Sequence, residues 1–468
     1  MEFVKSYRPQ STVIKCALGF IINPMSLEPV PIGIQHDPGA LYDQGELVIP
    51  SEARRKHMAI FGTTGAGKST LMRNMIAADI ASGVGCTVVD PHGQLVEDLL
   101  DNHIPRSRTD DVIYFNPKDP ARTIPLNLLD SPDHELDGVV VDNVISIFKQ
   151  LWPDAFGVGA RMEDIFRNSF YALIEHPSPT SLWNLPPFLT NDAYRALILR
   201  KVKNPAVRDF FENTYNRWTT SFREEAISPV LNKCRPFLTD PRMRAVIGPA
   251  HSTFRFRSLM DEGKILLCDL SKGAIGQDNA RLLGSIISMQ EKLAALSRYE
   301  VPEEHRVSHV LYVEEAQNFI GDFESILSES RKFNFHLVLA TQLIEQLSKP
   351  AASAVFANCA TLITFRVSST DAQRLHDEFV MLDSIAEALQ DLPDYKAYVR
   401  TLRQNGDGAG QPSGPHLVST YPPFLSTASN ADRARVVRTS TERWTRPRAE
   451  LEAKLVRFLK REFKGKGK

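Results

Sequence analysis

The stretch His57-Met-Ala-Ile-Phe-Gly-Thr-Thr-Gly-Ala-Gly-Lys-Ser-Thr70 contains the pattern G-x-x-x-x-G-K-[ST] from Gly62 to Ser69. The apolar run Met58–Phe61 predicts a buried strand before this loop, and apolar spacing from Leu71 predicts a helix after it. Glycines let such a loop turn tightly and point its backbone N–H groups at an anion near the helix N-terminus. The stretch therefore predicts a Walker A loop that binds a nucleoside triphosphate.

This loop also predicts the cofactors and their ligands. Lys68 is expected to reach the β- and γ-phosphates, and the Ser69 hydroxyl is expected to bind Mg²⁺. ATP and Mg²⁺ are the expected cofactors. The predicted nucleotide-binding residues are Gly62, Thr63, Thr64, Gly65, Ala66, Gly67, Lys68, Ser69 and Thr70.

Composition restricts the class of protein. The 468 residues include 55 Lys and Arg against 56 Asp and Glu, so any nucleic-acid surface must be local. The five cysteines are scattered without a C-x-x-C pair, which is typical of free thiols in a reducing compartment. No apolar run approaches the ~20 residues of a membrane span, and no signal peptide is evident. We therefore expect a cytoplasmic protein.

Strand-like and helix-like runs alternate on both sides of a long helical stretch. The alternation predicts an α/β fold, a RecA-like P-loop NTPase with a mostly parallel sheet. Helical spacing between the two halves predicts an all-α insertion. The expected units are a small β-rich segment (1–56), the first ATPase part (57–136), the insertion (137–257), the second ATPase part (258–403), and a linker (404–416) followed by a basic C-terminal helix and tail (to 468).

Two adjacent acids follow the apolar strand predicted at His309–Val313. A Walker A loop needs an acidic partner on a neighbouring strand, so Glu314 is expected to hold Mg²⁺ and Glu315 to orient the attacking water. Another predicted strand ends at Thr341, and Gln342 at its tip is a candidate sensor of hydrolysis. From the residues alone, two surface acids and a surface amide remain the alternative interpretation.

Several motifs together resemble the HerA/FtsK superfamily of motor ATPases, and within it the TraG-like type IV coupling proteins of conjugation. The resemblance runs from about Val48 to Leu402. It rests on Gly62–Thr70, Asp90-Pro-His-Gly93, Phe237-Leu-Thr-Asp-Pro241, Ile265-Leu-Leu-Cys-Asp-Leu-Ser-Lys-Gly273, Tyr312-Val-Glu-Glu-Ala-Gln-Asn-Phe319, Leu339-Ala-Thr-Gln342 and the helical insertion.

The resemblance implies a hexameric ring ATPase that pumps DNA. It favours Arg331 as an arginine finger acting on a neighbouring subunit, with Arg366 in reserve; the residues alone leave both arginines ambiguous. Two features depart from the family pattern. Glu314 stands where an Asp is usual, and the sequence lacks the membrane helices with which coupling proteins commonly begin, which puts a role at a secretion channel in doubt.

Two segments are locally basic. Arg195–Arg257 contains 13 Lys and Arg against 5 Asp and Glu, with Trp218, Phe222 and Phe237 among them, a composition that suits DNA or an ordinary solvated surface equally well. Arg443–Lys468 contains 10 positive and 3 negative residues and includes a predicted amphipathic helix at Pro447–Phe463.

The function expected from the sequence is ATP-driven DNA translocation by a homo-oligomeric ring, with the preferred DNA strand type left open. The catalytic residues expected are Lys68, Glu315, Gln342 and Arg331, with Ser69 and Glu314 at the metal. Relaxase, nuclease or secretion-channel proteins are the partner classes that this family implies. Two alternatives stay open: a HerA-like motor for DNA-end processing or phage defence with a nuclease, and a nucleotide-gated adaptor that recruits protein substrates.

Overall fold

A computed structural model describes residues 27–36, 45–131, 134–152, 160–319, 323–379, 383–403, 410–426 and 428–460. Parts of three sequence predictions lie outside these ranges: residues 1–26 of the N-terminal segment, 404–409 of the linker, and 461–468 of the basic tail.

An eleven-stranded sheet organises the fold, in the order β2-β1-β12-β11-β10-β3-β9-β8-β4-β7-β5. The seven strands from β10 to β5 are parallel, and the strands from β11 to β2 continue the sheet in antiparallel fashion. The α/β class with a mostly parallel sheet is thus confirmed. The strands are β1 (Val30–His36), β2 (Gly45–Ile49), β3 (Met58–Phe61), β4 (Gly85–Asp90), β5 (Val112–Phe115), β7 (Ile265–Asp269), β8 (His309–Val313), β9 (Phe335–Thr341), β10 (Thr361–Thr364), β11 (Lys396–Leu402) and β12 (Pro412–Thr420).

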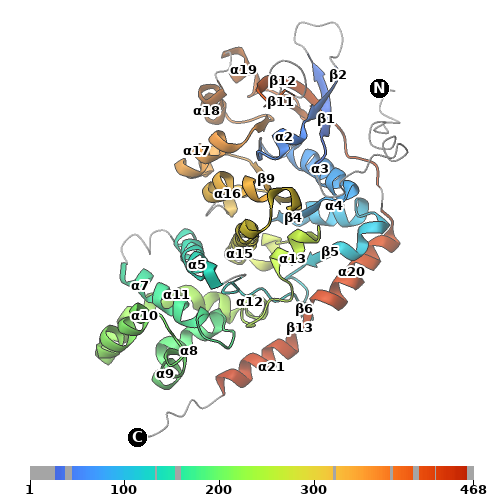
Figure 1. Ribbon diagram of the computed structural model, residues 1–468. Coiled ribbons are helices and arrows are strands. Elements are labelled where there is room, and N and C mark those ends of the chain that lie inside the picture. Colours follow the sequence, from blue (N-terminus) through green and yellow to red (C-terminus); the bar gives the residue numbers. More distant parts are fainter. Residues whose placement is uncertain are drawn as a thin grey trace.

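Helices cover both faces of the sheet (Figure 1). Alternate strand residues point to opposite faces, so Met58 and Ile60 of β3 join one core while Ala59 and Phe61 join the other. The first core contains α3 (Lys68–Ser82) and α4 (Gln94–Asn102). The second contains α15 (Gln277–Leu296), α16 (Phe323–Glu329) and α17 (Lys349–Asn358). The sheet and the helices on its two faces form one lobe. It also contains the shorter helices α2 (Ser51–Arg54), α14 (Lys272–Ile275), α18 (Ser369–Phe379) and α19 (Asp383–Ala388).

Between β5 and β7 the chain forms a second, helical lobe, drawn in teal and green below the sheet in Figure 1. Its interior is built from buried aromatic and aliphatic side chains, among them Phe148, Phe166 and Phe211. The helices are α5 (Asp137–Leu151), α7 (Ala160–Ile174), α8 (Leu185–Thr190), α9 (Asp192–Leu199), α10 (Pro205–Asp209), α11 (Thr220–Thr239) and α12 (Pro241–Ile247). The next helix, α13 (Phe256–Asp261), lies against α15 and β4 of the sheet lobe.

The C-terminal helices connect the two lobes. In Figure 1, α20 (Asn430–Trp444, red) runs beside β5, and α21 (Arg448–Leu459) continues to the helical lobe. Ser440 Oγ accepts a hydrogen bond of 2.8 Å from the backbone N–H of Tyr114 in β5, and Arg244 of α12 pairs with Glu452 at 2.9 Å. Between the helices, β13 (Arg446–Pro447) pairs with β6 (Arg122–Thr123). This segment, residues 430–459, is called the strap below.

The structure corrects two expectations and adds a helix that was not expected. Residues 412–416, placed in a linker because of their Gly, Pro and Ser, begin β12, which pairs with β11 and β1. Strands β1 and β2 extend the central sheet instead of forming a separate unit beside it. Helix α20 was not expected, whereas α21 lies within the predicted helix 447–463. None of the described helices has the length and apolar character needed to cross a membrane.

Candidate ATP-binding site

The predicted Walker A residues connect β3 to α3 at the carboxyl edge of the sheet. Gly62, Gly65 and Gly67 have φ angles of 156°, 80° and 121°, a region that side chains disfavour. Position 67 also has no room for a side chain, because a Cβ on Gly67 would lie 3.0 Å from Phe365 and 3.1 Å from Tyr395. The loop is therefore closely packed from outside, and the N–H groups of Gly62, Thr63 and Ala66 are bonded to Thr341 O, Arg366 O and Thr63 O.

Lys68 and Thr63 line this loop with polar groups that lack an anionic partner. The Lys68 ammonium donates hydrogen bonds to the carbonyl oxygens of Gly62 (2.6 Å) and Thr63 (3.1 Å). Burial lowers the pKa of Lys68, an effect that the nearby carboxylates Glu315 and Glu314 oppose. Thr63 Oγ1 is buried without a hydrogen-bond partner in the described part of the chain. A phosphate group would satisfy these groups, so the loop fits a triphosphate.

Glu314 reaches the P-loop from the end of β8. Ser69 Oγ donates a hydrogen bond to its carboxylate, which joins the two predicted Mg²⁺ ligands. Burial, followed by the adjacent carboxylate of Asp90, raises the pKa of Glu314 to about 7. A divalent cation would relieve both effects by compensating the buried negative charge, so these residues fit Mg²⁺. Asp90 belongs to a motif noted in the sequence, but its place beside Glu314 was not predicted.

Glu315 is held in position by two amides. Gln342 Nε2 donates to Glu315 Oε1 at 2.7 Å, and Gln317 Nε2 donates to Glu315 Oε2 at 2.5 Å. Gln317 in turn accepts a hydrogen bond of 2.8 Å from Thr341 Oγ1. Glu315 has a φ of 52°, a strained conformation for a residue with a side chain. The expected water-orienting acid and the expected sensor are thus brought together, while the bridging role of Gln317 was missed by the sequence analysis.

Lys272, which follows β7, is a second cation near the acids within the same chain. Burial lowers its pKa, while the charges of Glu315 and, to a smaller extent, Glu314 act to raise it. The sequence analysis noted the surrounding motif Ile265–Gly273 but assigned Lys272 no role. In the sequence, a long helix separates β7 from β8. In the sheet only β4 lies between them, and this order brings Lys272 near Glu314 and Glu315.

The two candidate arginine fingers lie at opposite edges of the sheet. Arg331 precedes β9 at the amino edge, where it contributes to the electrostatic environment of Glu52 and His57. Its exposed guanidinium makes no hydrogen bond or ion pair within the described ranges. Arg366 lies beside its own P-loop, but its guanidinium bonds Leu392 O (3.1 Å) and pairs with Asp394 at 2.9 Å. Arg331 is therefore far from the P-loop of its own subunit and free to contact another molecule.

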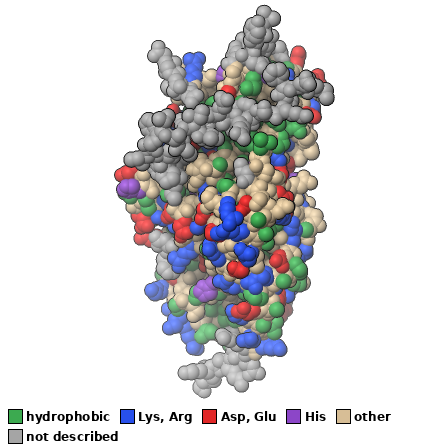
Figure 2. Space-filling model, turned by 90° about the vertical axis from the view of Figure 1, so that its right-hand side faces the viewer, with side chains coloured by type: hydrophobic (Ala, Val, Ile, Leu, Met, Phe, Trp, Pro, Cys, Tyr) green, Lys and Arg blue, Asp and Glu red, His purple; other side chains and the backbone are tan. Residues whose placement is uncertain are grey.

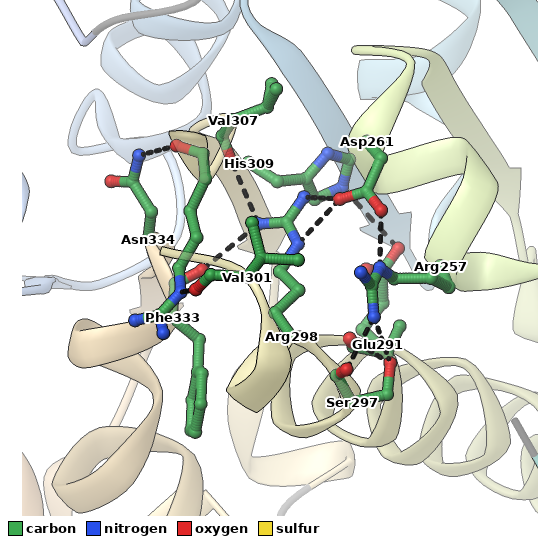
Figure 3. Close-up of polar contacts among 12 residues, drawn as sticks. Arg257, Asp261, Glu291, Ser297, Arg298, Val301, Val307, His309, Phe333 and Asn334 are labelled. Carbon is green, nitrogen blue, oxygen red and sulfur yellow. Dashed lines mark hydrogen bonds and ion pairs between the residues drawn. The ribbon is translucent and has the colours of Figure 1, made fainter. Parts of the chain in front are cut away.

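Buried polar residues fix the turn that carries Arg331 (residues 330–333), as Figure 3 shows. Arg298, fully buried, donates to the carbonyl oxygens of Phe333 (3.1 Å) and Val307 (2.8 Å) and pairs with Asp261. The next residues are held in the same way: Arg306 donates to Lys332 O, and Asn334 O accepts from the N–H of His309 at 3.1 Å. The exposed Arg331 thus stands on a rigid support.

The basic segment 195–257 is only partly available for a ligand. Arg195 is buried and bonded to Phe188 O and Leu189 O, and Phe237 lies in the core and cannot stack on a base. Arg200, Lys201 and Lys203 are exposed together after α9. On the face shown in Figure 2, where the strap lies, Lys and Arg side chains gather near the middle and recur below. The strap contributes the exposed residues Arg438, Arg443, Arg446 and Arg457.

A known family model matches part of the chain. Residues 39–156 match the family model of the helicase HerA central domain, which covers the Walker A loop and β4. The sequence has no significant match among functionally curated proteins.

Three solved structures share the fold. The bacterial conjugative coupling protein TrwBΔN70 is 18% identical, with 82% of this chain and 89% of that chain covered and a TM-score of 0.57. TrwB in complex with ADPNP is 19% identical, with 81% and 88% covered and a TM-score of 0.56. VirB4 of Thermoanaerobacter pseudethanolicus is 12% identical, with 86% and 98% covered and a TM-score of 0.50. The resemblance to HerA/FtsK-type P-loop ATPases with the coupling-protein fold is confirmed.

Proposed function

We propose that the chain is an ATPase that moves DNA as a ring of identical subunits, with six as the ring size that the HerA/FtsK resemblance implies. The observation that carries the proposal is the hydrogen bond from Ser69 to Glu314, because it joins the Walker A loop to the acid at the end of β8. The match to the HerA helicase central domain and the coupling-protein fold support a nucleic-acid substrate.

The residues at the carboxyl edge divide the chemistry of hydrolysis. ATP with Mg²⁺ would supply the γ-phosphoryl group and a cation that compensates its negative charge, and Ser69 and Glu314 would hold that cation. Lys68 would exchange its two loop carbonyls for phosphate oxygens, and Glu315 would orient the attacking water. Gln342 is bonded to the same carboxylate, so loss of the γ-phosphate would change its position and, through it, the position of the end of β9.

A neighbouring subunit would complete the site. Arg331 stands at the edge of the sheet opposite its own P-loop, so it can act only on a P-loop of another copy. Lys272 supplies a cation within the subunit, and Arg331 would add the charge that arrives only in the assembled ring. Hydrolysis would then depend on assembly.

DNA is assigned to the helical lobe, where Arg200, Lys201 and Lys203 form an exposed basic group. Such a group neutralises phosphates without reading bases. The test is the ATPase rate of the purified chain with and without single-stranded and double-stranded DNA. We expect stimulation by DNA and an affinity that weakens steeply with salt.

A triple variant, Arg200→Ala, Lys201→Ala and Lys203→Ala, should lower the slope of log affinity against log salt by about 2–3. The matched control removes the same charge from the strap (Arg438→Ala, Arg446→Ala and Arg457→Ala) and should leave the slope nearly unchanged. A turnover indifferent to both kinds of DNA, with an affinity flat in salt, would contradict translocation and favour the adaptor.

A further inference from the structure

Tyr395 is a second residue beside the P-loop whose backbone is strained. Its φ is 62°, and only His57, Glu315 and Asn334 share this left-handed region among the described non-glycine residues. An aromatic residue is rarely found there, because its Cβ crowds the backbone. Such strain persists only where the surroundings impose it, and it concentrates at ligand sites.

The surroundings that impose this conformation are the P-loop and β12. The Tyr395 N–H donates to the carbonyl of Ala66 at 2.8 Å. Its own carbonyl accepts from the N–H (2.8 Å) and the Oγ1 (2.9 Å) of Thr420. Its ring and Cα pack against Gly67, where an added Cβ would meet them at 3.1 and 3.3 Å. Tyr395 is therefore fixed to the P-loop itself.

The ring of Tyr395 nevertheless remains open to solvent. The residue is 48% exposed, one of the few large apolar residues so exposed in the described ranges. Its hydroxyl makes no hydrogen bond there either. These backbone contacts account for the strain, but neither core packing nor a hydrogen bond of the hydroxyl within the described structure explains an exposed aromatic ring at this place.

The order of the strands indicates which end of a nucleotide lies near this ring. Glu315 and Gln342 mark the γ-phosphate side, at β8 and β9 on one side of β3. Tyr395 precedes β11, on the other side of β3 beyond β10. A triphosphate bound with its γ end at Glu315 therefore extends its nucleoside end towards Tyr395.

We propose that the Tyr395 ring is the platform on which the nucleobase stacks. The inference rests on the proposed ATP site and extends it to the nucleoside end. Every base has a π face, so a single stacking ring predicts similar affinities for ATP and GTP. Removing the ring should weaken nucleotide binding about tenfold to a hundredfold.

The experiment compares the Mg²⁺-dependent binding of AMPPNP and of inorganic tripolyphosphate, which lacks the nucleoside, to the full chain by calorimetry. Tyr395→Ala should lose affinity for AMPPNP and keep that for tripolyphosphate, whereas Tyr395→Phe should bind both like the wild type. Tyr299→Ala, which removes a tyrosine that is 53% exposed elsewhere, is the matched control and should bind both normally. Lys68→Ala should lose both ligands.

Two further outcomes distinguish a failure of base stacking on Tyr395 from a failure of the ATP site. If the wild type binds AMPPNP in a Lys68-dependent manner and Tyr395→Ala binds it equally well, or loses tripolyphosphate in parallel, the stacking role is overturned and the ATP site stands. If the wild type binds neither ligand, both fail. As a second measurement, the fluorescence of Tyr395→Trp should be quenched by AMPPNP and not by tripolyphosphate; an unchanged signal with bound AMPPNP would count against stacking.

Discussion

The two edges of the parallel sheet are built in different ways. At the carboxyl edge, Lys68 and Thr63 point polar groups into a loop that does not satisfy all of them, and Glu314 shares a crowded negative region with Asp90. At the amino edge, the carbonyls around residues 331–334 are bonded, and one arginine stays exposed. The first edge is prepared to receive a ligand, and the second is prepared to present a charge.

Under the proposed function, one chain would hold two parts of a catalytic site at opposite edges of the sheet. Each P-loop would then need the Arg331 of another copy. Variants at either edge test whether the two edges act together.

Arg331→Ala should bind ATP normally and hydrolyse it about 10³–10⁵ times more slowly, the effect of a finger supplied by a neighbour in other switches. The measurement is the steady-state ATPase rate beside the nucleotide dissociation constant. Arg366→Ala is the matched control, because that arginine is already paired with Asp394.

Mixing gives the sharper form of this test. A Lys68→Ala subunit keeps its Arg331 and can serve the intact P-loop of an Arg331→Ala neighbour. Partial recovery on mixing two inactive variants is expected. If confirmed mixed rings stay inactive, or if Arg331→Ala loses nothing, the two edges do not meet.

Glu315→Gln tests the carboxyl edge alone. An amide can still accept a hydrogen bond from Gln342 but cannot act as a base, so hydrolysis should fall about 10²–10⁴-fold while ATP and Mg²⁺ still bind. Glu314→Ala should instead weaken the Mg²⁺ dependence of nucleotide binding, because it removes the partner of Ser69. Equal turnover of Glu315→Gln and wild type would mean that another group orients the water.

His57 tests the amino edge through stability. Burial lowers its pKa from 6.5 to about 4, and its Nδ1 accepts a hydrogen bond of 3.0 Å from the N–H of Leu337. Below pH 6.5 the unfolded chain binds a proton that the folded chain does not, so stability should fall as the pH drops from 6.5 to 4. The loss should reach about 3 kcal/mol, and above pH 6.5 this histidine should contribute no slope.

The measurement for His57 is urea unfolding across this pH range. The control variant is His57→Asn, because Asn tolerates the φ of 60° and offers an acceptor to Leu337. The difference between wild type and variant removes contributions from other groups, such as the buried His336. Parallel pH profiles for the two proteins would contradict the assignment.

Arg306→Ala should have the smallest effect. It removes one support of the turn, the hydrogen bond to Lys332 O, and leaves Arg298 in place. The lost charge-assisted hydrogen bond contributes about 1.5–3 kcal/mol to holding the turn. Without it, Arg331 should be placed less accurately, and hydrolysis should slow about tenfold. Arg306→Lys should restore part of the rate. A variant that changes stability but not the rate would show that the turn does not position the finger.

The structure brings together the local elements named from the sequence, because a short pattern defines each. The Walker A loop, the paired acids after β8 and the amide after β9 each follow a buried apolar strand, and the parallel sheet brings the strand ends together. Contacts between distant segments could not be read in this way. Arg298 looks like any surface arginine until Asp261, Val307 and Phe333 surround it.

Strand β12 was missed for a related reason. Residues 412–416 contain the Gly, Pro and Ser of a linker, and much of β12 is only half-buried, so no apolar run marks it. Pairing on both sides, with β11 and β1, makes it a strand. The strain at Tyr395 likewise follows from its contacts with Ala66 and Thr420, which lie far away in the sequence.

The place of β1 in the sheet also has a consequence for synthesis. Gly33 pairs with Thr420, so β1 and β2 reach the rest of the sheet only through a strand that is made hundreds of residues later. At about 5–20 residues per second, the first hairpin must wait for roughly 20–80 s. During that time β1 presents an unpaired edge, the feature through which nascent chains aggregate. The strand order that completes the sheet therefore leaves the hairpin of β1 and β2 without its neighbour while the intervening chain is made.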